Sequence, residues 1–114
     1  MGSYMEKTQI TSIWYESDEW AEPYDENDSN MDVIFALSDG TKWIVTFFTY
    51  QNILSLSRKN KTTGECLKGL YFCATDMVLI ETLTKDNVVN VLNEMIRENE
   101  ISTYCTPLEN DVGA

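Results

Sequence analysis

The sequence predicts an α+β fold: a mostly antiparallel sheet of about four strands with two helices packed on it, in a single domain. Three stretches carry this prediction. They are the densest apolar run, GLYFCATDMVLIETLT from Gly69 to Thr84, the hairpin signal Asp39-Gly40, and an amphipathic pattern from Lys85 to about Asn99.

The first strand is expected over Thr8–Tyr15, where aromatic and β-branched residues alternate with polar ones. Residues 31–38 and 41–48 then form a hairpin around Asp39-Gly40, because this pair is typical of a two-residue type I′ turn. That turn fixes the register, with Ala36 opposite Trp43, Ile34 opposite Val45 and Phe35 opposite Ile44.

Both faces of this hairpin then carry large apolar side chains. One face holds Ile34, Ala36, Trp43, Val45 and Phe47, and the other holds Met31, Val33, Phe35, Leu37, Ile44 and Phe48. A sheet with one solvated face alternates apolar and polar residues more regularly. Either helices cover both faces, or one face meets another molecule.

The apolar run is interpreted as one long central strand. Its two β-type pieces, Leu70–Ala74 and Met77–Leu83, flank Thr75-Asp76, where we expect a bulge. One helix is expected before this apolar run in the sequence, and another after it. The first is capped by Thr49 and runs to about Asn60, and the second is capped by Thr84.

The expected domain covers residues 8–108, and residues 101–108 form an edge segment or cover the end of the second helix. Residues 1–7 begin with MGSYM, which is typical of a cloning remnant, and we expect them to be disordered. Residues 109–114 are expected to fray. No apolar run reaches the roughly 20 residues of a membrane span, and no secretory signal is evident, so we expect a cytoplasmic protein.

Composition excludes several classes of function. The net charge of −11, from 19 acidic and 8 basic residues, disfavours nucleic acid and anionic membranes and favours a basic protein partner. The absence of histidine removes the usual general base and His-ligated zinc. Cys66, Cys73 and Cys105 lack metal-site spacing, and we interpret them as buried free thiols. We expect no cofactor, no metal site and no catalysis.

Residues 16–30 form an acidic loop and are the first candidate site. The loop holds seven carboxylates and no Lys or Arg up to position 28, and Pro23 and the Asn/Asp run favour turns. Clustered carboxylates beside aromatic rings suit a basic protein surface, although a merely solvated loop has the same composition. The predicted partner-binding residues are Glu16, Asp18, Glu19, Trp20, Glu22, Tyr24, Asp25, Glu26 and Asp28.

Asp76 is the second candidate, because a lone carboxylate in an apolar strand is either poised for chemistry or accepts hydrogen bonds at a bulge. A pocket lined by Tyr71, Cys73 and Asp76 is the corresponding enzymatic hypothesis. The one basic cluster is Arg58, Lys59, Lys61 and Lys68, which holds four of the eight basic residues. We interpret that cluster as a solvated helix end that balances the acidic surface.

Four short patterns between Ser38 and Asn99 resemble a group of small, functionally uncharacterised bacterial α+β proteins. They are DGTKW (39–43), FFTYQNI (47–53), TGECLKGLYF (63–72) and DMVLI (76–80). The resemblance implies no catalytic residue. In size and acidity the chain is also loosely similar to immunity proteins that neutralise bacterial toxins.

We therefore predict a non-enzymatic protein-interaction module of the immunity or inhibitor type, which binds a basic partner through the acidic loop. The alternative is a homo-oligomeric accessory protein, such as a homodimer, or a small-ligand-binding one, which uses an apolar sheet face. The third interpretation is a small enzyme with a pocket around Asp76.

Overall fold

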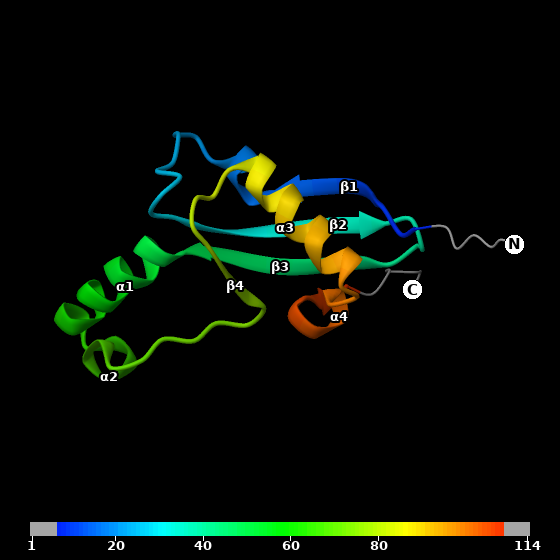
Figure 1. Cartoon of the computed structure of the whole chain (residues 1–114). Coiled ribbons are helices and arrows are strands. Elements are labelled where there is room, and N and C mark those ends of the chain that lie inside the picture. Colours follow the sequence, from blue (N-terminus) through cyan, green and yellow to red (C-terminus); the bar gives the residue numbers. More distant parts are fainter. Residues whose placement is uncertain (1–6, 109–114) are drawn as a thin grey trace, which may run out of the picture.

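The computed structural model describes residues 7–108. Its sheet has the strand order β1-β2-β3-β4, with a fifth short strand paired to β3 (Figure 1). The strands are β1 (Ile10–Tyr15), β2 (Asn30–Leu37), β3 (Lys42–Thr49), β4 (Met77–Ile80) and β5 (Thr106–Pro107). Only the β3–β4 pair is parallel. The predicted α+β class with a mostly antiparallel sheet is confirmed. The expected terminal segments 1–6 and 109–114 lie outside the described residues.

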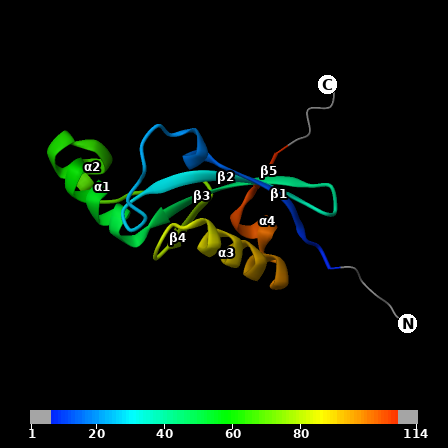
Figure 2. The ribbon, with the colours of Figure 1, turned by 90° about the horizontal axis from the view of Figure 1, so that it is seen from above.

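Helices α3 (Lys85–Arg97) and α4 (Ile101–Tyr104) lie together on one side of the sheet (Figure 2). Thr84 caps α3 as predicted, because its side chain accepts a hydrogen bond from the Asn87 N–H at 3.1 Å. The predicted apolar stripe is buried on the sheet. The core residues with less than 2% exposure are Met31, Val33, Phe35, Val45, Phe47, Leu83, Val88 and Leu92.

The hairpin turn differs from the prediction by one residue. Gly40 has a φ of 90°, but the φ of Asp39 is not positive, which rules out a type I′ turn. The Leu37 C=O accepts from Gly40 N–H at 3.0 Å, and Leu37 N–H donates to the Thr41 C=O at 2.9 Å. This is a three-residue loop with the bulge that Gly40 allows. The Asp39 carboxylate favours it by accepting the Thr41 N–H at 2.9 Å.

The shifted turn changes which side chains share a face, so the predicted register is wrong. Phe35 pairs with Trp43, Ile34 with Ile44 and Val33 with Val45. The core face therefore combines Met31, Val33, Phe35, Leu37, Trp43, Val45 and Phe47. The second face holds Trp14, Ile34, Ala36, Ile44, Thr46, Met77 and Leu79. This second face is partly open, with Trp14 39% and Leu79 41% exposed.

The long central strand is also wrong. Only Met77–Ile80 pairs with the sheet, and it lies at the end of the strand order, beyond β3. Asp76 has a φ of 57°, a left-handed conformation, and it lies immediately before β4 instead of at a bulge within a longer strand. Its C=O accepts the Thr46 N–H at 2.9 Å, which fixes the start of β4. The apolar residues before it lie on the surface, with Leu70 77% exposed.

The connection between β3 and β4 forms an arm, defined here as residues 50–73. It contains α1 (Tyr50–Thr63) and α2 (Glu65–Gly69), and it extends beyond the ends of the strands (Figures 1 and 2). Thr49 caps α1 as predicted, by accepting the Asn52 N–H at 3.0 Å. The helix runs three residues past the expected Asn60 and ends at Gly64, whose φ is 89°.

The turn α2 is left-handed. Cys66, Leu67 and Lys68 have φ values of 53–60°, a conformation that costs roughly 1–2 kcal/mol for each non-glycine residue. Gly69 follows with a φ of 81° and packs closely on α1, since an added Cβ would lie 2.6 Å from the Ser57 carbonyl oxygen. Contacts with α1 and hydrogen bonds within the turn offset this strain: the Ser57 hydroxyl donates to the Gly69 C=O at 3.4 Å, and the Leu70 N–H donates to the Cys66 C=O at 3.0 Å.

Replacing Gly69 by alanine is expected to loosen the arm without unfolding the sheet. Gly64→Ala is the matched control, because Gly64 also has a positive φ but no atom lies within 4 Å of its added Cβ. The control should lower arm stability by about 1–2 kcal/mol. Gly69→Ala should lower it further through the clash with Ser57. Hydrogen exchange of the α1 amides measures both effects, and equal protection in the two variants would contradict the close packing.

Candidate functional site

The acidic loop is held against the domain by contacts near its centre. The Tyr24 hydroxyl donates to the Leu83 C=O at 2.9 Å, and the Leu83 N–H donates to the Glu26 C=O at 2.7 Å. Trp20 and Tyr24 meet edge to face at 5.4 Å, and both rings are half-buried against the core. Burial raises the pKa of the Tyr24 hydroxyl, and the Glu26 carboxylate adds to the rise. These two rings, which are predicted to contact a partner, anchor the loop within the domain.

Three of the loop carboxylates bind partners within the domain. Glu16 begins the loop's first turn, η1 (Glu16–Glu19). Its carboxylate accepts the N–H of Asp32 in β2 at 2.8 Å. Asp18 pairs with Lys85 at 2.7 Å, and the hydrogen bond raises the pKa of the Lys85 ammonium. The same ammonium lies 4.8 Å from the centre of the Tyr15 ring. Lys85 therefore joins the loop, β1 and α3.

Asp28 is the third internally bound carboxylate, and it connects the loop to α1. It accepts from Asn52 Nδ2 at 2.9 Å and from the Ser55 hydroxyl at 2.7 Å. These hydrogen bonds, more than the nearby Arg58 charge, lower the pKa of Asp28. Asn30 also donates to Asn52 Oδ1 at 2.8 Å. Sequence reasoning missed Asn52 and Ser55, because nothing in a helical pattern marks two polar residues as partners of a distant carboxylate.

Four loop carboxylates point outward and carry the charge of the loop. They are Glu19, Glu22, Asp25 and Glu26, all of them exposed. Glu19 accepts a long bond of 3.4 Å from the Trp14 indole, and Asp25 accepts the Asn27 N–H at 2.9 Å. No ion pair within residues 7–108 neutralises any of the four. Of the seven loop carboxylates predicted to bind a partner, these four are both exposed and without an ion pair in residues 7–108.

The arm beside the loop exposes most of the large apolar side chains found on the described surface. Five of the eight such residues lie on it: Tyr50 (57% exposed), Leu54 (53%), Leu67 (70%), Leu70 (77%) and Tyr71 (53%). The same arm carries the basic cluster Arg58, Lys59, Lys61 and Lys68, whose side chains are exposed. An apolar surface bordered by charge is typical of a protein-binding site.

The structure does not group the residues of the hypothetical enzyme pocket. Tyr71 and Cys73 are exposed on the arm, whereas the Asp76 carboxylate accepts a hydrogen bond from the Thr106 hydroxyl. Asp76 also faces Cys105, whose pKa is raised to about 12 by burial first and by the Asp76 charge second. Asp76 therefore has the structural role of joining the start of β4 to β5. The expectation of buried thiols holds for Cys105, but Cys73 is exposed and Cys66 half-buried.

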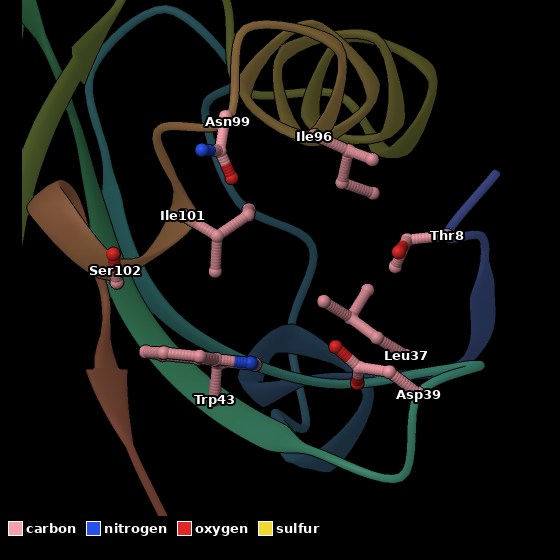
Figure 3. A pocket seen from close by; sticks show the side chains of 8 residues that line it. All are labelled: Thr8, Leu37, Asp39, Trp43, Ile96, Asn99, Ile101 and Ser102. Carbon is pink, nitrogen blue, oxygen red and sulfur yellow. The ribbon is translucent and has the colours of Figure 1, made fainter. Parts of the chain in front are cut away.

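A cavity of about 140 Å³ lies at the hairpin end of the sheet, away from the arm (Figure 3). It is smaller than the roughly 300–1,000 Å³ of most ligand pockets. Its lining residues are Thr8, Leu37, Asp39, Trp43, Ile96, Asn99, Ile101 and Ser102. Asp39 is the one carboxylate among them, and its hydrogen bonds to Thr41 lower its pKa. None of the predicted site residues lines this cavity.

Comparisons of the chain with protein-family models, with curated proteins and with solved structures found no match. Within residues 7–108, no group of three or more Cys, Asp or Glu side chains is arranged to hold a metal ion. None of the described helices is long and apolar enough to cross a membrane.

Asp28→Asn is expected to weaken the link between the loop and α1. The folded pKa of Asp28 lies below its unfolded value, so its stabilisation is present at neutral pH and is lost as pH falls through the folded pKa. The variant should lose about 1 kcal/mol at pH 7 and less than that at pH 3, which lies below the ordinary aspartate pKa of about 3.9. Urea unfolding at both pH values tests this, with the exposed Glu22→Gln as control. A loss of the same size at both pH values would contradict the assignment.

The Cys105 thiol should react more slowly than the thiols of Cys66 and Cys73 by more than the difference in exposure alone suggests. At pH 8 only about one in ten thousand Cys105 side chains is a thiolate, because its pKa is about 12. Native protein treated with iodoacetamide should be modified first at exposed Cys73, then at Cys66, and at Cys105 only after denaturation. Peptide mass spectrometry at successive times measures the order. Rapid native labelling of Cys105 would show that it is not buried as described.

Proposed function

We propose that this protein is a non-enzymatic interaction module, of the immunity or inhibitor type, whose acidic loop binds a basic protein surface. One observation carries the proposal: at a single end of the molecule, four outward carboxylates adjoin an arm with five exposed large apolar side chains. Exposed apolar surface of this kind is costly in water and marks protein contacts. The nearby charge then selects a partner of opposite sign.

The two kinds of side chain have different physical roles in this proposal. The unpaired carboxylates attract a basic surface over about a Debye length, which mainly increases the association rate. Apolar side chains such as Leu54 and Leu70 slow dissociation once they are desolvated. The anchoring of the loop by Tyr24 and Asp28 limits the entropy that binding costs, because the carboxylates are already positioned.

A second function is favoured by a separate observation, the partly open second face of the sheet. Trp14 and Leu79 are 39% and 41% exposed, and Ile34 and Ile44 between them are half-buried. This face suits the alternative of a homo-oligomeric or ligand-binding accessory protein. It predicts association that responds to Trp14 and Leu79 but is indifferent to the acidic loop. The enzymatic interpretation has less support, because the Asp76 carboxylate is hydrogen bonded to Thr106.

Removing two outward charges should weaken partner binding. Proteins captured from a lysate of the source organism would be titrated against wild type and against Glu22→Gln/Glu26→Gln. At 50 mM salt the variant should bind about tenfold more weakly, from roughly 0.7 kcal/mol for each exposed charge. Glu94→Gln/Glu98→Gln is the control for net charge, since it removes two exposed carboxylates at the C-terminal end of α3, where both pair with Arg97. Affinity that ignores both the loop charges and added salt would overturn the proposal.

A further inference from the structure

The cavity at the hairpin end of the sheet combines apolar walls with a polar rim (Figure 3). Its apolar lining residues are buried or half-buried: Leu37, Trp43, Ile96 and Ile101. Its exposed polar lining residues are Asp39, Asn99 and Ser102. The volume of about 140 Å³ equals the share of about five water molecules in the liquid. The cavity therefore suits a ligand of only a few heavy atoms.

One chain of hydrogen bonds fixes an aromatic ring and a carboxylate at this cavity. The Trp43 indole N–H donates to the Thr41 hydroxyl at 2.8 Å, and that hydroxyl donates to Asp39 Oδ1 at 2.5 Å. The Thr41 N–H donates to the same Oδ1 at 2.9 Å, and no other residue within 7–108 donates a hydrogen bond to Asp39 Oδ2. Figure 3 shows the indole edge on, with the Asp39 carboxylate beside its nitrogen. An aromatic face and a negative oxygen therefore meet on one side of the cavity.

The charges around the cavity favour a cation. The hydrogen bonds from Thr41 hold the pKa of Asp39 below its ordinary value, so this carboxylate is ionised at neutral pH. None of the described residues that line the cavity is Lys or Arg. Arg97 of α3 follows a lining residue in the sequence, but it pairs with Glu94 and Glu98 at 2.5 and 2.8 Å. The net charge of −11 adds a negative field that attracts cations and repels anions.

We propose that this cavity binds a small methylated ammonium ion. The positive charge lies against the Trp43 ring face, in the cation–π arrangement by which aromatic side chains hold quaternary ammonium groups. Asp39 Oδ2 adds direct attraction from the same side. Leu37, Ile96 and Ile101 cover the methyl groups. A primary ammonium fits less well, because it is strongly hydrated and the apolar walls offer it no acceptor. Ligand binding here involves neither the acidic loop nor the arm, so it is separate from the function proposed above.

Titrations followed by two-dimensional amide NMR test this binding, with sodium chloride keeping the ionic strength equal. Choline should shift the Trp43 indole signal and the amides of Asp39 and Ile101 in a saturable way, with a Kd on the order of 1 mM. Dimethylbutanol with the shape of choline, carbon replacing its nitrogen, is the matched neutral ligand. It should bind about tenfold more weakly, because it lacks the charge. Ethanolamine tests the methyl groups and should also bind more weakly than choline.

Two variants separate the charge of Asp39 from its role in the turn. Asp39→Asn removes the charge but keeps an oxygen that can accept the Thr41 N–H. It should weaken choline binding about fivefold. The affinity for the neutral ligand should stay the same, which shows that the cavity is intact. Glu100→Gln is the matched control, because Glu100 lies between two lining residues in the sequence but does not line the described cavity. It should bind choline like wild type.

Four results would overturn the proposal. The first is equal affinity of wild type for choline and for its neutral counterpart, which would indicate an apolar hollow without charge recognition. The second is tighter binding of ethanolamine than of choline. The third is unchanged choline affinity in Asp39→Asn. The fourth is a set of choline shifts centred on residues 16–30 instead of the cavity, which would indicate a counterion at the acidic loop.

Discussion

The hydroxyl of Thr49 holds the end of the sheet, the acidic loop and the arm together. Thr49 ends β3, is fully buried, and accepts the N–H of Ser29 at 3.2 Å and of Asn52 at 3.0 Å. Its own N–H donates to the Ser29 C=O at 3.0 Å, and it pairs with Ile80 of β4. One side chain thus fixes the end of a strand, the start of α1 and the end of the acidic loop. Because these are joined, the loop and the arm keep a defined relation to each other.

The direction of α1 has consequences for both faces of the sheet. Parallel strands need a crossover connection, and its helix usually packs on the sheet. Here α1 continues beyond the strand ends, so it covers neither face (Figure 2). The core face is closed by α3 through Val88, Leu92 and Met95 and by α4 through Ile101. The second face stays partly open. On the arm, Phe72 packs edge to face on Phe48, whereas Leu67, Leu70 and Tyr71 stay exposed.

Much of the fold could be read from local patterns. The caps at Thr49 and Thr84 and the stripe along α3 were predictable, because each depends on residues within a few positions. The hairpin register was not, since the hydrogen bonds that the Thr41 N–H and hydroxyl donate to the Asp39 carboxylate favour the three-residue turn over the two-residue one. For the loop, composition identified the acidic character. Composition could not show that Asp28 is hydrogen bonded within the domain while Glu22 faces solvent. The hydrogen-bond partners of Asp28 lie 24 and 27 residues away in the sequence.

The largest error, the central strand over residues 70–74, follows from the assumption that an apolar run is buried within its own chain. Leu70 and Tyr71 are as apolar as core residues, yet 77% and 53% of their surface faces water. The hydrophobic effect does not distinguish burial within a chain from burial between chains. A segment with core composition on a projecting arm is therefore typical of an interface.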